Sequence, residues 1–96
     1  MMTIDAAIDD YLHTIVRTRP WTKKREEELL EALSDWLYQQ PEPRIRLPEI
    51  GPELVQQYAR ATELSTDDHR ALLGALHNLY TWSIHAEAVE ENPFAA

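Results

Sequence analysis

The C-terminal third of the chain most constrains its fold, because its apolar residues recur with helical spacing. From Arg70 to Trp82 leucines recur with helical spacing, at residue 72 or 73 and then at 76 and 79, which predicts a long amphipathic helix with one buried stripe. Ser65 or Thr66 is the expected N-cap. Asn92 and Pro93 end the tail that follows, because proline has no backbone N–H and disfavours helix in the residue before it. The expected stripe is Leu72 or Leu73, Leu76, Leu79, Tyr80 and Ile84.

The apolar pattern upstream predicts three further helices joined by turns. The first begins after Thr3, which is its expected N-cap. The second follows Pro20, with Thr22 as its N-cap, and ends before Pro41. A proline-rich connector leads to Pro52, where the third helix begins, because proline suits a first helical turn. The expected inward-facing residues are Ile4, Ile8, Leu12, Ile15, Leu29 or Leu30, Leu33, Trp36, Leu37, Leu47, Ile50, Leu54, Val55 and Tyr58.

Length and composition indicate one domain. A chain of 96 residues can build one small core but not two. Its 44% hydrophobic content supports a packed core despite a net charge of -8. The absence of cysteine excludes disulfides, thiolate metal sites and a cysteine nucleophile. No run approaches the ~18 apolar residues of a membrane span, and the N-terminus has no leader pattern. We expect a single all-α domain over residues 1–96, a four-helix bundle located in the cytoplasm.

Positive charge is concentrated at the turn between the first two helices. Five of the nine basic residues lie between Arg17 and Arg25. Free backbone N–H groups at the start of the second helix lie beside them, so the cluster has the chemistry of a phosphate-contact patch. The alternative is a solvated helix, because glutamates at 26–28 follow Lys23 and Lys24 at the spacing of intrahelical ion pairs. The net negative charge of the chain repels a polyanion, so DNA binding by this domain alone should be weak.

The histidines and glycines form no catalytic or metal-binding pattern. His69, His77 and His85 are eight residues apart, about 12 Å along a helix, which is too far for one metal ion. No pair has the i, i+4 spacing of a zinc-binding helix. The glycines, Gly51 and Gly74, supply no phosphate-binding loop. Close helix packing would explain Gly74 in the middle of the last helix, where glycine is unfavourable. We therefore expect no catalytic residue, no cofactor and no metal site.

Several short motifs occur in a fixed order along the chain. They are Tyr11-Leu12, Thr22, the apolar set Leu30, Leu33 and Leu37, the entry Leu47 to Tyr58, then Leu72-Leu73-Gly74-Ala75-Leu76, Leu79-Tyr80, Trp82 and Asn92-Pro93. From about Ile8 to Phe94 this series resembles the N-terminal core-binding domain, which is SAM-like, of the tyrosine recombinases, the phage integrase family. Each motif alone is common, and the order and spacing carry the resemblance.

The resemblance implies an orthogonal, SAM-like bundle of four helices that closes on duplex DNA as one jaw of a clamp. The partners would be duplex DNA, the catalytic domain of the same or a longer protein, and recombinase protomers on the DNA. Residues 90–96 would begin the interdomain linker. The catalytic residues of the family belong to the second domain, so this chain is not expected to cut or rejoin DNA. The matching DNA-binding positions are Thr22, Lys23, Lys24, Arg25, Thr66, His69, Arg70 and His77.

Three positions depart from the family pattern. Glu26 stands where an aromatic residue is usual, and His77-Asn78 stand where a basic pair is common. The customary glycine after the last helix is missing, since Ala86-Glu87-Ala88 occupy that stretch. An alternative hypothesis is therefore an acidic helical protein-interaction module that kept the fold but not DNA binding. Basic residues sharing one face would favour DNA, and acids interspersed among them would favour a protein partner.

Overall fold

Proline and serine set the helix starts in the computed structural model, which describes residues 2–15 and 20–95. The described residues form four α-helices and one short 3-10 helix: α1 (Ile4–Ile15), α2 (Pro20–Tyr38), η1 (Leu47–Glu49), α3 (Pro52–Ala61) and α4 (Thr66–His85). Pro52 lies in the first turn of α3, where its missing N–H is not needed. Ser65 caps α4, its Oγ accepting the Asp68 N–H at 3.1 Å. The prediction of an all-α, four-helix bundle is confirmed.

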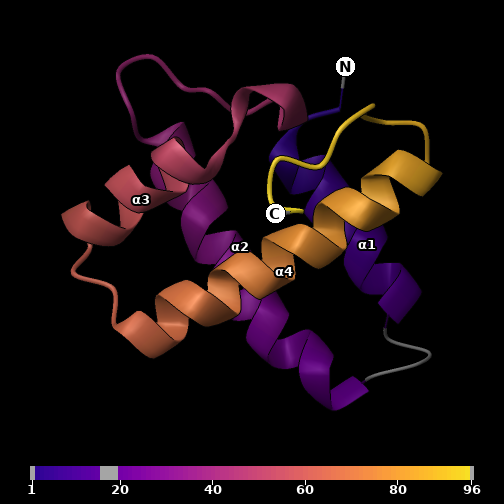
Figure 1. Cartoon of the computed structure of the whole chain (residues 1–96), viewed down its shortest axis with the longest axis horizontal. Coiled ribbons are helices and arrows are strands. Elements are labelled where there is room, and N and C mark those ends of the chain that lie inside the picture. Colours follow the sequence, from indigo (N-terminus) through magenta and orange to yellow (C-terminus); the bar gives the residue numbers. More distant parts are fainter. Residues whose placement is uncertain (1, 16–19, 96) are drawn as a thin grey trace.

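The helices cross one another around a single core. Helix α4 crosses α2, and α1 packs against both of them, while α3 contacts α2 (Figure 1). The chain measures 33 × 29 × 25 Å along its principal axes. The largest fully buried side chains are Tyr80, Ile4, Ile8, Leu30, Leu33, Leu37, Leu47, Ile50, Leu72, Leu76, Leu79 and Val55. They come from all four α-helices, from η1 (Leu47) and from the residue that follows η1 (Ile50). Every element therefore contributes to the core.

The connector between α2 and α3 is fixed to the N-terminus. Ile4 donates its backbone N–H to the Ile45 carbonyl at 2.7 Å, and Leu47 donates to the Met2 carbonyl at 3.3 Å. These bonds flank an isolated antiparallel bridge between Thr3 and Arg46. The bridge carries Leu47 into the core, where its side chain is fully buried, as predicted.

Three sequence-based expectations are wrong. Helix α2 begins at Pro20, so Thr22 lies inside it and is not its N-cap; Pro20 itself suits the first helical position. Ile84 is 38% exposed. Each step of four residues, from Leu72 through Leu76 and Tyr80, overshoots one helical turn by about 40°, and the accumulated drift carries residue 84 out of the buried stripe. Gly74 is exposed, and a Cβ added there would meet nothing within 4 Å. Close helix packing therefore does not explain that glycine.

Helices α3 and α4 end with the same backbone motif. Glu63 and Glu87 adopt positive φ angles of 52° and 60°. The following residues donate back to the helices, Leu64 N to Ala59 O at 2.9 Å and Ala88 N to Ser83 O at 2.8 Å. This is the Schellman geometry, in which glycine is the usual residue at positive φ. A glutamate thus occupies the conformation of the customary glycine, and α4 ends at His85.

Candidate nucleic-acid interface

An exposed ion pair joins the two segments of the chain that contain the predicted DNA-binding residues. The Arg25 guanidinium on α2 donates to Asp68 Oδ1 in the first turn of α4 at 3.0 Å. The residues are 43 positions apart in the chain, and their side chains are 60% and 44% exposed. The early part of α2 and the start of α4 therefore form one edge of the molecule, here called the α2–α4 edge and defined by residues 24–25 and 66–70.

The predicted DNA-binding residues divide into four groups. Lys24 and Arg25 are exposed on α2, next to the start of α4. Thr66, Arg70 and His77 are exposed on α4. At about 100° per residue they share the outer face of that helix, roughly opposite Asp68. His69 is half-buried between these two faces. The side chains of Thr22 and Lys23 lie outside the described part of the structure.

Acidic side chains are interspersed among these basic residues. Asp67 and Asp68 occupy the first turn of α4, where the helix dipole favours negative charge. Asp68 neutralises Arg25 directly. A phosphate group would have to compete with that carboxylate for the guanidinium, and it would also approach Asp67. Spacing along the sequence gives no signal that Asp68 pairs with Arg25, because the two residues are 43 positions apart.

A buried carboxylate lies next to the edge and ties three helices together. Glu26 is only 8% exposed. It accepts the Tyr11 hydroxyl of α1 at 2.9 Å and the Asn78 amide N–H of α4 at 3.2 Å. The ring of Tyr11 also contacts Trp82, with centroids 6.2 Å apart. Glu26 and Asn78, two separate departures from the family pattern, are therefore hydrogen-bond partners. Glu26 thus faces the interior of the bundle, while the preceding Lys24 and Arg25 are exposed.

The C-terminal tail returns to α4 at His77. Asn92 donates its side-chain N–H to the His77 carbonyl and to Thr81 Oγ1, both at 3.1 Å. Its own Oδ1 accepts the Phe94 N–H at 2.9 Å. His77 Nδ1 lies 3.2 Å from the Phe94 carbonyl. His77 thus already has a partner in the tail, and residues 92–94, expected at the start of a linker, pack on the domain.

Local contacts raise the pKa values of three tyrosine side chains. Burial raises the pKa of both Tyr58 and Tyr80. The bond that the Tyr38 hydroxyl donates to Asp5 Oδ1, at 2.7 Å, raises the pKa of Tyr38. All three phenols are thus held in the neutral form. Among the described residues no group of three or more histidines and carboxylates is arranged to hold a metal ion, and no described helix has the length and apolarity to cross a membrane.

Comparisons with models of known protein families, with curated proteins and with solved structures found no match to this chain.

Proposed function

We propose that this domain binds duplex DNA at the α2–α4 edge, as the core-binding domain of a tyrosine recombinase would. The observation that carries the proposal is the Arg25–Asp68 contact, which places the basic segment of α2 next to the start of α4, where the resemblance assigns further DNA contacts. The catalytic residues would belong to a separate domain, so the function of this chain is to hold and orient DNA, in recombination or integration, without cutting it.

Contacts to phosphate would provide the affinity. Lys24 and Arg25 on α2 and Arg70 on α4 are exposed cations. Thr66 and His69 add hydrogen-bond donors around the start of α4, with Thr66 and Arg70 on the face away from Asp68. To bind a phosphate, Arg25 exchanges one anion, Asp68, for another. An exposed ion pair contributes little to stability, about 0–1 kcal/mol, so this exchange costs little. The net gain is also small, because Asp67 and Asp68 stay close to the DNA. Weak, salt-sensitive binding by the isolated domain follows.

A titration of the 15N-labelled chain with a short DNA duplex tests this proposal. At low salt we expect amide shifts at residues 24–25 and 66–70, and we expect them to collapse at roughly 200 mM salt. Asp68→Asn should tighten binding about threefold to tenfold, because Arg25 loses its competing anion, and Arg25→Ala should weaken it by a similar factor. Glu42→Gln, beyond the far end of α2 and exposed, is the control with the same change in net charge.

The same variants can overturn the proposal. Equal tightening by Asp68→Asn and Glu42→Gln would indicate that DNA responds only to net charge and not to the α2–α4 edge. Shifts at low salt that lie away from this edge would assign DNA to another surface.

The second candidate function is protein binding by an acidic helical module. The observation favouring it is the position of Asp67 and Asp68 in the first turn of α4, since acids interspersed among the basic residues reduce the attraction for a polyanion. If DNA causes no amide shifts at either salt concentration, in the unmodified chain or in Asp68→Asn, this candidate is favoured over the first.

A further inference from the structure

A groove separates the C-terminal tail from η1 and the beginning of α3. Its volume is about 1130 Å³. One wall contains Pro48, Pro52 and Leu54, and the other contains Ala88, Val89 and Pro93. Tyr80 of α4 contributes to the lining between them. Along α4, Tyr80 is twelve residues from Asp68, roughly 18 Å, so the groove is distinct from the α2–α4 edge.

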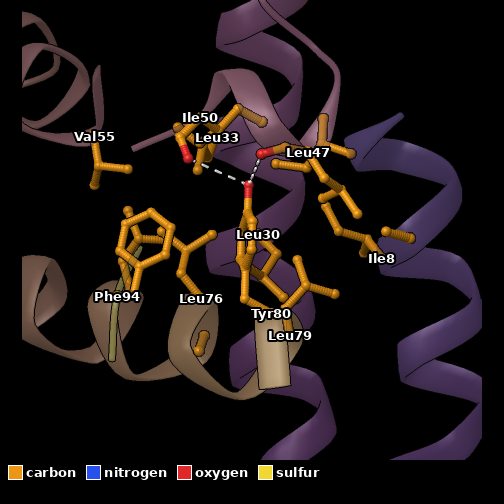
Figure 2. Close-up of a cluster of buried hydrophobic side chains, with 14 of the residues drawn as sticks. Ile8, Leu30, Leu33, Leu47, Ile50, Val55, Leu76, Leu79, Tyr80 and Phe94 are labelled. Atoms are coloured by element: carbon orange, nitrogen blue, oxygen red, sulfur yellow. Dashed lines mark hydrogen bonds between the residues drawn. The ribbon is translucent and has the colours of Figure 1, made fainter. Parts of the chain in front are cut away.

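Both walls of the groove are fixed by the same buried residue. The Tyr80 hydroxyl donates to the Leu47 carbonyl at 2.5 Å and to the Ile50 carbonyl at 3.4 Å, which holds η1 (Figure 2). The Tyr80 ring packs on Phe94, with centroids 5.2 Å apart, which holds the tail. Phe94 is itself 9% exposed and belongs to the core. A groove whose walls are already ordered binds a ligand without the entropy cost of forming the site.

Negative charge surrounds this groove. Glu49, Glu53, Glu87, Glu90 and Glu91 line it, and Arg44 is the one cation among the described residues that line it. All five glutamates are exposed. Within the described part of the chain none of these carboxylates forms a salt bridge, and they do not converge as a metal-binding group. They are therefore available as separate partners for several cationic side chains.

We propose that this groove binds a short basic peptide segment of a protein partner. Apolar side chains of that segment would pack on Leu54, Val89 and the prolines of the walls, and its lysine or arginine side chains would pair with the glutamates around them. Charge complementarity selects this occupant, because five carboxylates against one guanidinium repel nucleic acid and acidic peptides. The proposal does not rest on DNA binding, which involves the other end of α4.

A peptide titration tests the proposal on the intact, 15N-labelled chain. The probe is a nonapeptide of alternating lysine and leucine, and the control probe carries glutamate in place of each lysine. We expect amide shifts with the basic peptide at residues 49–54 and 87–91, and none with the acidic one. Shifts spread over the acidic residues of α1 and α2, or no binding of the basic peptide, would overturn the proposal.

Matched double variants separate the groove from overall charge. Glu53→Gln with Glu90→Gln should weaken binding of the basic peptide at least about fivefold. Asp10→Asn with Glu28→Gln changes the net charge equally, at exposed positions of α1 and α2, and should change binding less than about twofold. Equal weakening by both doubles would overturn the proposal. Shifts at the groove that depend on protein concentration without peptide would overturn it too, because a second copy would then be the occupant.

Discussion

The two halves of α4 use polar contacts in opposite ways. At its start, Asp68 holds Arg25 in an exposed pair, with side chains 44% and 60% accessible. In its second half, the fully buried Tyr80 hydroxyl holds the Leu47 and Ile50 carbonyls. One helix therefore carries one contact that is exposed to solvent and another that is buried.

The difference in burial suits the exposed contact to ligand binding and the buried contact to maintaining the fold. An exposed pair contributes about 0–1 kcal/mol, so a ligand can replace it at little cost. A buried hydrogen bond contributes a similar net amount when made, but its loss leaves unsatisfied groups away from water and costs about 1–3 kcal/mol. We therefore expect a ligand to displace Asp68 from Arg25 readily, and we expect the hydrogen bonds of Tyr80 to persist and maintain the fold.

Tyr80→Phe removes the buried hydroxyl and keeps the ring that packs on Phe94. The Ile50 carbonyl loses a hydrogen-bond donor, and the Leu47 carbonyl keeps only the weaker bond from Ile50 N, at 3.3 Å. We expect the free energy of unfolding to fall by about 1–3 kcal/mol, measured by urea denaturation. Unchanged stability would contradict this expectation. It would mean that water satisfies these carbonyls, so that the Tyr80 bonds are as easily replaced as the Arg25–Asp68 pair.

Glu26→Gln tests a buried polar contact close to the exposed edge. The glutamate accepts from both Tyr11 and Asn78, and a glutamine would turn its N–H group toward one of these donors. We expect a loss of about 1–2 kcal/mol in the free energy of unfolding. Glu28→Gln has the same change in charge at an exposed site on α2 and should move stability by less than about 0.5 kcal/mol. Equal effects of the two variants would mean that charge, and not the bond, is responsible.

Local signals in the sequence were enough for most of the fold. Pro52 and Ser65 predicted the starts of α3 and α4, and leucine spacing predicted which faces are buried. The errors arose where one residue type fits two positions. Pro20 ends a segment or begins a helix, and it begins α2. Glycine in a helix packs closely or faces solvent, and Gly74 faces solvent.

The candidate site was predicted only as separate residues. Exposure of Lys24, Arg25 and Arg70 follows from charge. Their partners do not, because Arg25 meets Asp68 across 43 residues, and Glu26 meets Asn78 across 52. Such pairings depend on how α2 and α4 cross, which single-chain periodicity does not determine. The groove was missed for the same reason, since Tyr80 joins η1 and the tail only after folding.

Gly74→Ala tests whether the middle of α4, between the Arg25–Asp68 pair and the Tyr80 contacts, tolerates a side chain. Nothing lies within 4 Å of an added Cβ, so alanine gains helix propensity without a clash. We expect about 0.5–1 kcal/mol of stabilisation and a thermal midpoint higher by several degrees. DNA binding at the α2–α4 edge should be unchanged, because stability alone has been altered. A lower midpoint would show that a contact across this face restricts the side chain at residue 74.

A pH titration of the Asp5–Tyr38 pair measures the smallest effect, at a second exposed contact. The Tyr38 hydroxyl, and then Thr3, lower the pKa of Asp5 below its ordinary 3.8. This lowering contributes stability above pH 3.8 that is lost as pH falls through the folded-state pKa. Tyr38→Phe should therefore reduce the thermal midpoint near pH 6 and converge with the unmodified chain near pH 2.

The difference between the two chains is the informative quantity, because another acid acts in the opposite direction. Burial, and then Glu27, Asp35 and Asp9, raise the pKa of Glu31, so protonation of Glu31 stabilises the fold as pH falls. That contribution is common to both chains and cancels when their midpoints are subtracted. A difference that stays constant from pH 6 to pH 2 would show that Tyr38 acts through packing, and the exposed pair would then resemble the buried Tyr80 contact more than Arg25–Asp68.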